Sequence, residues 1–232
     1  MRGVALLVCV AAAAIAAVGV ARAAQSPRAV RASIVNAARA QQSVHYKTSQ
    51  IIGNGLLTLT GDVEAADGTQ HVSLKVGKKT AHLAIVVSDQ TAYVQGDAAG
   101  LQALQGLTKT QASTYAGQWI SIPKGDKDYD ETAADVTLGS LIQLSTPRGH
   151  LVARSRKFHG KRLVAVIGIT GKGKKKEVQV LAAPRKGKRL PVEEDELSPG
   201  QEYISHTVFG RWNEAVQVPV PASSVPISTV RG

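Results

Sequence analysis

The stretch from Gly55 to Gly77, GLLTLTGDVEAADGTQHVSLKVG, alternates apolar and polar residues on either side of a central turn. A period of two predicts β-strands with one apolar face each. Asp67-Gly68, between the two runs, predicts the turn of an antiparallel hairpin. Other parts of the fold must cover the apolar face of this hairpin. Its apolar positions are Leu57, Leu59, Val63, Val72, Leu74 and Val76.

Further strands are predicted on both sides of this hairpin. Short runs rich in β-branched residues occur at HYKTSQII (45–52), AHLAIVVSD (81–89) and TAYVQGD (91–97). Turn formers separate the runs at Gly53-Asn54-Gly55, Gly77-Lys78-Lys79 and Asp89-Gln90. Short strands joined by tight turns predict an antiparallel meander over residues 45–97.

Helical patterns precede and follow the meander. Ser26 is a candidate N-cap before Pro27, so a helix is predicted over 27–42. The stretch 93–123, YVQGDAAGLQALQGLTKTQASTYAGQWISIP, begins and ends like a strand. Two short helices are predicted inside it, with Asp97 capping the first and Gly117 ending the second. Two more helical segments are predicted at 128–135 and 138–145.

The second half of the chain returns to strand patterns. Apolar, β-branched runs occur at 150–158, 162–170, 177–183, 190–197 and 202–212. The tail, VQVPVPASSVPISTVRG (216–232), is rich in proline and is predicted to be extended. The chain has no internal repeat and no long linker, so we expect a single domain over residues 24–232. An antiparallel sheet with helices on one face gives an α+β fold.

The N-terminus has the layout of a secretory signal. An uncharged apolar run, residues 3–21, follows Arg2 and precedes Ala21-Arg22-Ala23. We therefore expect residues 1–23 to be a signal peptide, cleaved after Ala23, although the run is also long enough for an uncleaved anchor. Cys9, the only cysteine, lies early in the run and is interpreted as part of the signal. The protein is thus expected to be exported and soluble or peripherally membrane-associated.

The charge favours anionic partners. The net charge of +11 becomes +9 once Arg2 and Arg22 are removed, which favours an anionic membrane or cell-wall surface. Export and an aromatic content of 4% argue against nucleic acid. A monomer is expected. The candidate contacts to an anionic surface crowd two turns: Lys172, Lys174, Lys175 and Lys176, then Arg185, Lys186, Lys188 and Arg189.

Catalytic and metal-binding patterns are absent from the sequence. There is no G-x-S-x-G elbow, and no two of the six histidines have the i, i+4 spacing of a helical metal site. In GITGKGKKK (168–176) a lysine follows G-x-x-x-x-G-K where a P-loop needs Ser or Thr. DKDYDE (126–131) has Glu131 where an EF-hand needs glycine. We expect neither an enzyme nor a cofactor or metal site.

Several short motifs resemble a known family. TAYVQGDAAGLQAL, YAGQWISIPKGD, VTLGSLI, GKRLPVEEDE and VFGRWNEAVQVPVPASSV follow one another along the chain. In this order they resemble the LppX/LprG-type lipoproteins of actinobacteria, whose fold is related to the lipoprotein carrier LolA. The family's lipobox cysteine is absent here.

The resemblance implies a strongly curved antiparallel half-barrel with helices packed on its concave face, enclosing an apolar core or cavity. Family members bind the acyl chains of lipids or lipoglycans and are implicated in carrying them to the outer envelope. Residues 96–116 would then form a helical lid over the sheet, with Trp119 on the strand that closes it.

Two functions follow from these patterns. The first is a lipid- or amphiphile-binding protein for cell-envelope lipid or lipoglycan transport, burying acyl chains between sheet and helices. The alternative is a non-catalytic structural or interaction module with a filled core that binds anionic surfaces through its basic turns. The candidate cavity residues are Leu57, Leu59, Val72, Leu74, Val76, Leu83, Ile85, Val87, Leu101, Leu104, Trp119, Leu138 and Leu141.

Overall fold

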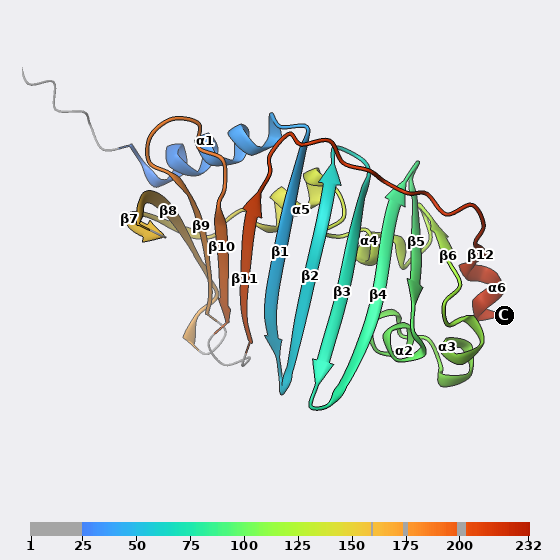
Figure 1. The fold of residues 1–232 in the computed structure, drawn as a ribbon. Coiled ribbons are helices and arrows are strands. Elements are labelled where there is room, and N and C mark those ends of the chain that lie inside the picture. The colour runs from blue at the N-terminus through green and yellow to red at the C-terminus, as the bar shows by residue number, and fades with distance from the viewer. Residues whose placement is uncertain (1–24, 159, 174–175, 199–202) are drawn as a thin grey trace, which may run out of the picture.

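One continuous β-sheet forms the body of the computed structural model, which describes residues 25–158, 160–173, 176–198 and 203–232 (Figure 1). The first half of the sheet consists of β1 (Ser43–Ile52), β2 (Gly55–Glu64), β3 (Gly68–Val76), β4 (Lys79–Ser88), β5 (Thr91–Gly96) and β6 (Ile120–Pro123). The second half consists of β7 (His150–Phe158), β8 (Lys161–Thr170), β9 (Glu177–Pro184), β10 (Glu193–Ser198) and β11 (Tyr203–Gly210). The predicted meander and the predicted return to strands are both confirmed.

Pairing between distant strands joins the two halves. β11 lies antiparallel to β1, with Thr48 opposite Thr207. The strand order is therefore β12-β6-β5-β4-β3-β2-β1-β11-β10-β9-β8-β7, where β12 (Val225–Pro226) pairs parallel with β6. Because β1 and β11 lie far apart in the sequence, this one pairing joins the two halves into a single sheet.

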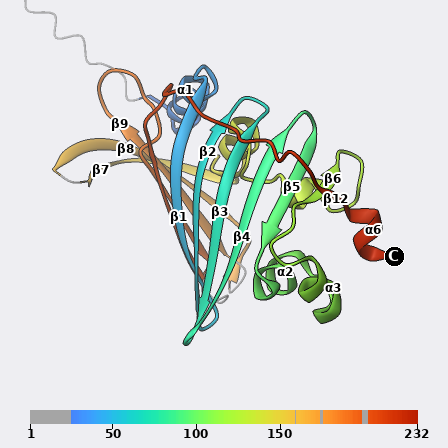
Figure 2. The same cartoon turned by 45° about the vertical axis from the view of Figure 1, so that its right-hand side comes forward.

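The sheet curves strongly, and helices occupy its concave side (Figure 2). Towards the β7 edge these are α1 (Pro27–Arg39) and α5 (Leu138–Leu144), and towards the β6 edge they are α2 (Ala98–Gln105), α3 (Lys109–Tyr115) and α4 (Tyr129–Thr132). The Ser26 side chain caps α1, as predicted, and Asp97 caps α2. The α+β half-barrel with helices on its concave face is thus confirmed.

Two hydrophobic clusters hold the helices on the sheet. Under α2, the fully buried Leu101 lies in a cluster with Val94 and Ile120. Under α1 and α5, Ile34 and Leu141 lie in a second cluster with Val166. Every described helix and strand falls between Pro27 and Arg231, and the predicted signal, 1–23, lies outside the described residues.

The prediction of a wholly extended tail is wrong at its end. Residues 211–224 run extended along the ends of the strands (Figure 1), but Ile227–Arg231 form a short helix, α6. Ile227 is buried in the cluster under α2, and the guanidinium of Arg231 lies 3.1 Å from a carboxylate oxygen of Asp126. Tertiary contacts, which local patterns do not encode, therefore induce this helix.

A tyrosine clamp fixes the connection between α4 and α5 on the concave face. The fully buried ring of Tyr46 lies over Gly61 on the neighbouring strand, since a Cβ on Gly61 would be 2.3 Å from the ring. The Tyr46 hydroxyl donates to the carbonyl of Asp135 (2.8 Å) and accepts from Nε2 of Gln70 (2.5 Å). Next to it, Gly68 lets the backbone of Val136 approach, because a Cβ there would be 2.2 Å from that carbonyl oxygen.

We expect Gly61→Ala to lower the free energy of unfolding by about 1–3 kcal/mol, because its methyl group would displace the Tyr46 ring from a packed core. The matched control is Gly210→Ala, also in a strand, where nothing lies within 4 Å of an added Cβ. Urea denaturation of residues 24–232 measures both. Equal stability of the two variants would contradict the clamp.

Candidate ligand-binding groove

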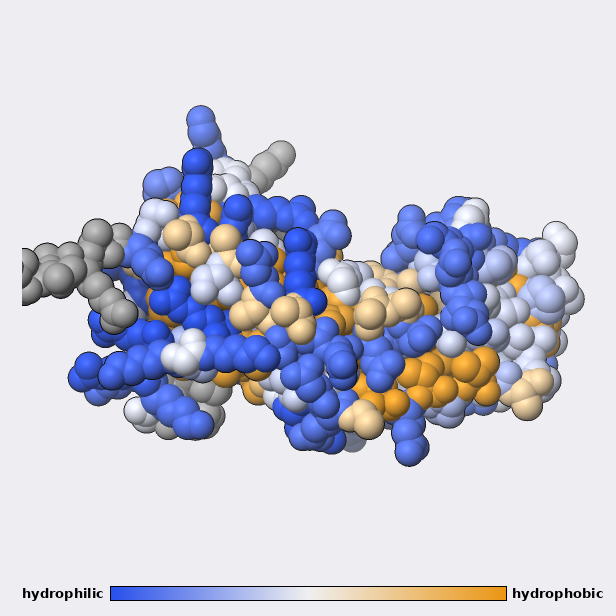
Figure 3. Space-filling model, turned by 90° about the horizontal axis from the view of Figure 1, so that it is seen from above, coloured by the Kyte–Doolittle hydropathy of each residue, from blue (hydrophilic) through white to orange (hydrophobic). Residues whose placement is uncertain are grey.

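A groove runs along the concave face between the sheet and helices α2, α4 and α5. It consists of two adjoining pockets, which we name the β2–β4 pocket (about 550 Å³) and the β9–β11 pocket (about 350 Å³). Gln50, Leu59 and Asp135 line both, so the clamped α4–α5 connection lies where they meet. Seen along the strands, the molecular surface is indented on the side that carries the helices (Figure 3). The volumes of the two pockets lie in the usual range of small-molecule sites.

Strand register determines which side chains form the floor. Residues directly opposite each other in neighbouring strands share a face, so one row across the sheet contains Leu181, Glu194, Thr207, Thr48, Leu59, Val72 and Leu83. The next row contains Gln179, Glu196, Ser205, Gln50, Leu57, Leu74 and Ala81. Each row is polar across β10, β11 and β1 and becomes apolar from β2 to β4.

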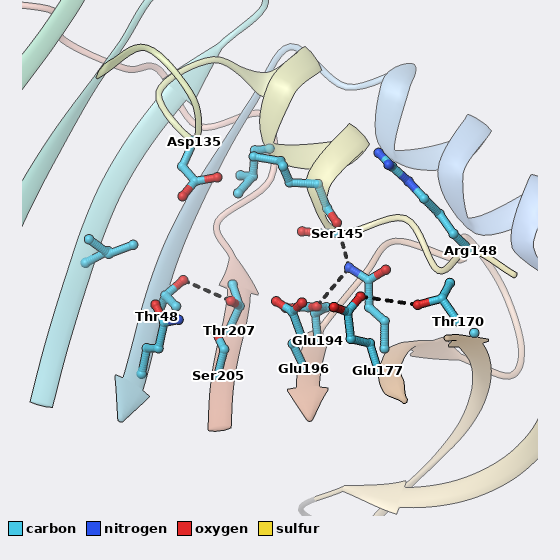
Figure 4. Close-up of a pocket in the computed structure, with 16 residues that line it drawn as sticks. Thr48, Asp135, Ser145, Arg148, Thr170, Glu177, Glu194, Glu196, Ser205 and Thr207 are labelled. Atoms are coloured by element: carbon cyan, nitrogen blue, oxygen red, sulfur yellow. Dashed lines mark hydrogen bonds between the residues drawn. The ribbon is translucent and has the colours of Figure 1, made fainter. Parts of the chain in front are cut away.

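The β9–β11 pocket is rich in carboxylates. Glu194 and Glu196 project from β10, Glu177 from β9, and Asp135 approaches from the α4–α5 connection (Figure 4). Arg148 is the only basic residue among the described residues that line this pocket. Gln179 donates from one amide nitrogen to Oε1 of Glu194 (3.1 Å) and to the carbonyl of Leu144 (2.6 Å). The pocket therefore offers mainly hydrogen-bond acceptors and negative charge.

Burial changes the protonation of these acids. Glu194 is only 5% exposed, and burial raises its pKa to about 7, with a further increase from Glu196 and opposing hydrogen bonds from Gln179 and Thr207. Burial also raises the pKa of Asp135, again with a contribution from Glu196. Both groups are easier to protonate than ordinary carboxylates, because the charged form has lost water.

The predicted cavity residues separate into three groups. Those that line the two pockets are Leu57, Leu59, Val72, Leu83, Ile85, Leu104 and Leu141. Val87, Leu101 and Leu138 are buried in the hydrophobic clusters. Leu74 and Val76 continue the concave face towards the β3–β4 turn, and Trp119 precedes β6, where its carbonyl accepts from Val225 of the tail. In the predicted lid, residues 103–106 form a wall of the β2–β4 pocket.

The basic turns lie apart. Lys172 and Lys176 lie in the β8–β9 turn, whereas Arg185, Lys186, Lys188 and Arg189 lie in the β9–β10 connection; Lys174 and Lys175 lie outside the described residues. β9, with its eight residues, separates the two groups by about 25 Å. The Lys188 ammonium donates to Oε1 of Gln41 (2.8 Å) beside α1. None of the six basic residues that the structure describes in these turns lines either pocket of the groove.

The acids of the groove did not stand out in the sequence. EEDE (193–196) lies within a run predicted as strand, and period two places Glu194 and Glu196 on one face and Glu193 and Asp195 on the other. This alternation could have indicated a polar face, but not that the face is covered. Among the described residues, no three His, Asp or Glu side chains are grouped to hold a metal ion.

Solved structures share this fold. LprF from Mycobacterium bovis matches at 15% identity with a TM-score of 0.53, covering 85% of this chain and 97% of that one. The lipoprotein LppX of Mycobacterium tuberculosis matches at 15% identity with a TM-score of 0.51, covering 84% and 100%. No protein-family model and no curated protein matches the sequence. The resemblance in fold is thus confirmed, and the chain has an LppX/LprG-type fold.

We expect the buried Glu194 to make the protein less stable as pH rises. Its folded pKa of about 7 lies above the ordinary 4.5, so the stabilising contribution of Glu194 is greatest below pH 4.5 and is lost as pH rises from 4.5 through 7. Glu194→Gln should remove this loss and raise the free energy of unfolding at pH 8 by up to about 3 kcal/mol. The raised pKa of Asp135 also lowers the free energy of unfolding as pH rises.

Urea denaturation between pH 4.5 and 8 measures this effect. Glu214→Gln, a change at an exposed carboxylate outside the groove, is the matched control and should leave the pH profile unchanged. An unchanged profile for Glu194→Gln, or a variant less stable than wild type at pH 8, would contradict the assignment.

Proposed function

We propose that this protein binds an amphiphile in the groove, with an acyl chain on the floor of the β2–β4 pocket and a polar group in the β9–β11 pocket. The proposal rests on one observation: a single cross-strand row changes from polar residues, Glu194 and Thr207, to apolar residues, Leu59 and Val72. A molecule with one polar and one apolar end matches such a surface along its whole length.

The β2–β4 pocket offers an apolar floor for the acyl chain. Leu57, Leu59, Val72, Leu83 and Ile85 lie side by side on β2, β3 and β4, and Leu104 faces them from α2. Burying a methylene group here contributes about 0.8 kcal/mol. The opposite wall carries Asp128 and Glu131, so the groove is apolar on its sheet side rather than all round.

The charge of the β9–β11 pocket disfavours anionic headgroups. Among the described residues, four carboxylates and a single arginine line the β9–β11 pocket, so a phosphate there would meet like charge. Hydroxyl and amine groups can instead donate to the oxygens of Glu194, Glu196 and Gln50. We therefore propose a headgroup rich in hydroxyls, as in a glycolipid, or one with an amine.

A role in the cell envelope is part of this proposal. The predicted signal favours export, and the fold is shared with a mycobacterial lipoprotein. The helices in the described part of the chain are too short or too polar to cross a bilayer. We propose that the protein carries or holds its ligand without catalysis, as a monomer outside the cytoplasm.

The alternative, a filled core with basic turns as the binding surface, has less support. The two pockets leave space between sheet and helices, and the two basic turns lie at opposite ends of β9. A polyanion would have to span that distance. Salt separates the two functions, because binding through lysines weakens steeply with salt and chain burial does not.

Native mass spectrometry of residues 24–232, purified gently from a host with ordinary membranes, tests the proposal. We expect co-purified lipid at near-stoichiometric amounts. Leu59→Trp, which fills the junction of the two pockets, should lower lipid occupancy at least fivefold, whereas Val220→Trp, at an exposed position of the tail, should not.

Circular dichroism verifies that both variants fold. A clean lipid-free mass for the wild type, with no gain in mass when lipids are added back, would remove the proposal. Equal occupancy of the two tryptophan variants would instead place the lipid outside the groove.

A further inference from the structure

Exposed hydrophobic side chains gather at the turns of two neighbouring hairpins. Ile51, Ile52 and Leu56 in β1–β2 and Val76 in β3–β4 are 46%, 47%, 45% and 41% exposed. Strand pairing brings them together, since Ile51 is opposite Leu56 and Val76 is opposite Gly55. Both turns project at the lower edge of the sheet in Figure 1. We name residues 51–56 and 74–79 the hairpin tip.

The tip is apolar on both faces. Ile52 lies two residues after the groove residue Gln50, and Val76 lies two residues after Leu74, which is opposite the groove residue Leu57. Both side chains therefore continue the concave face. Ile51 and Leu56 lie on the opposite face. An isolated exposed aliphatic residue is ordinary, but four at one projecting edge form a contiguous patch of the kind that contacts other molecules.

The charge around the tip indicates the partner. Residues 50–57 and 73–81 contain Lys75, Lys78 and Lys79 and no acidic residue. Lys75 is opposite Leu56, and Lys79 is opposite Val76, so the lysines alternate with the exposed aliphatic side chains. The β8–β9 turn, with Lys172 and Lys176, lies at the same end of the strands.

We propose that the hairpin tip docks into the surface of an anionic lipid bilayer. The aliphatic side chains would enter the boundary between headgroups and acyl chains, and the lysine ammoniums would remain at the anionic headgroups. A second copy of the chain fits less well, because two tips would bring six ammonium groups together without any carboxylate from either tip.

The tip is continuous with the groove. On the concave face, Leu74 of the tip lies opposite Leu57 of the β2–β4 pocket, and the next pair, Leu59 with Val72, also lines that pocket. An acyl chain leaving a docked bilayer would thus meet apolar side chains throughout. This use of the tip as a loading route rests on the proposed function, whereas docking itself does not.

Co-sedimentation with vesicles tests docking on residues 24–232. The vesicles contain phosphatidylglycerol and phosphatidylcholine in equal parts. Ile51→Ser/Leu56→Ser alters only the outer face of the tip and leaves the groove intact. We expect it to weaken vesicle binding at least tenfold. The matched control, Val208→Ser/Val220→Ser, removes two aliphatic residues with similar exposure elsewhere and should bind like the wild type.

Two further measurements define the mode of docking. Lys75→Gln/Lys78→Gln/Lys79→Gln should weaken binding to these vesicles at least tenfold, and the wild type should bind pure phosphatidylcholine at least tenfold more weakly. Brominated lipids should quench the fluorescence of the tryptophan introduced by Leu56→Trp, because docking would place this side chain at the depth of the acyl chains. Absence of quenching would overturn insertion.

The outcomes separate docking from ligand binding. Unchanged lipid occupancy of Ile51→Ser/Leu56→Ser in native mass spectrometry, together with lost vesicle binding, supports docking independently of the groove. Docking is overturned if Ile51→Ser/Leu56→Ser binds vesicles as tightly as the wild type. It is also overturned if the control variant loses as much vesicle binding as Ile51→Ser/Leu56→Ser. Light scattering that shows a dimer dispersed by Ile51→Ser/Leu56→Ser would make the tip a contact between copies and also overturn it.

Discussion

The contact between Tyr46 and Gly61 is the constraint on which the groove depends. A Cβ on residue 61 would be 2.3 Å from the ring of Tyr46, so glycine leaves room for the buried ring against the neighbouring strand. In this position the Tyr46 hydroxyl donates to the carbonyl of Asp135. Burial raises the pKa of Tyr46, so the hydroxyl keeps its proton and remains a donor. The clamp thereby fixes the α4–α5 connection above the sheet, leaving a pocket on either side of it.

The electrostatics of the groove oppose those of the whole molecule. The chain carries a net charge of +11, yet carboxylates line the β9–β11 pocket. Four consecutive acids on β10 divide between its faces: Glu194 and Glu196 face the groove, whereas Glu193 and Asp195 pair with Arg156 on the other face. The net charge of the chain is therefore no guide to the charge inside the groove.

Local patterns in the sequence predicted most strands and helices, because alternation and capping act over a few residues. They did not predict α6, which is held by the distant Asp126, or the β1–β11 pairing that makes one sheet. The apolar half of the groove was anticipated at residues such as Leu59 and Leu83. The acidic half was not, since the sequence shows that Glu194 and Glu196 share a face but not that a helix covers it.

The same two hairpins supply the floor of the groove and the exposed tip, and strand geometry explains why. Alternation with a period of two continues to the end of each strand, so the apolar face that α2 and α4 cover at Leu59 emerges uncovered at Ile52 and Val76. A fold under selection only for solubility would place polar residues where the cover ends. Here lysines occupy the neighbouring positions while the aliphatic residues remain. The end of the groove is thus an apolar edge framed by positive charge, which is the surface that the proposed docking to a bilayer requires.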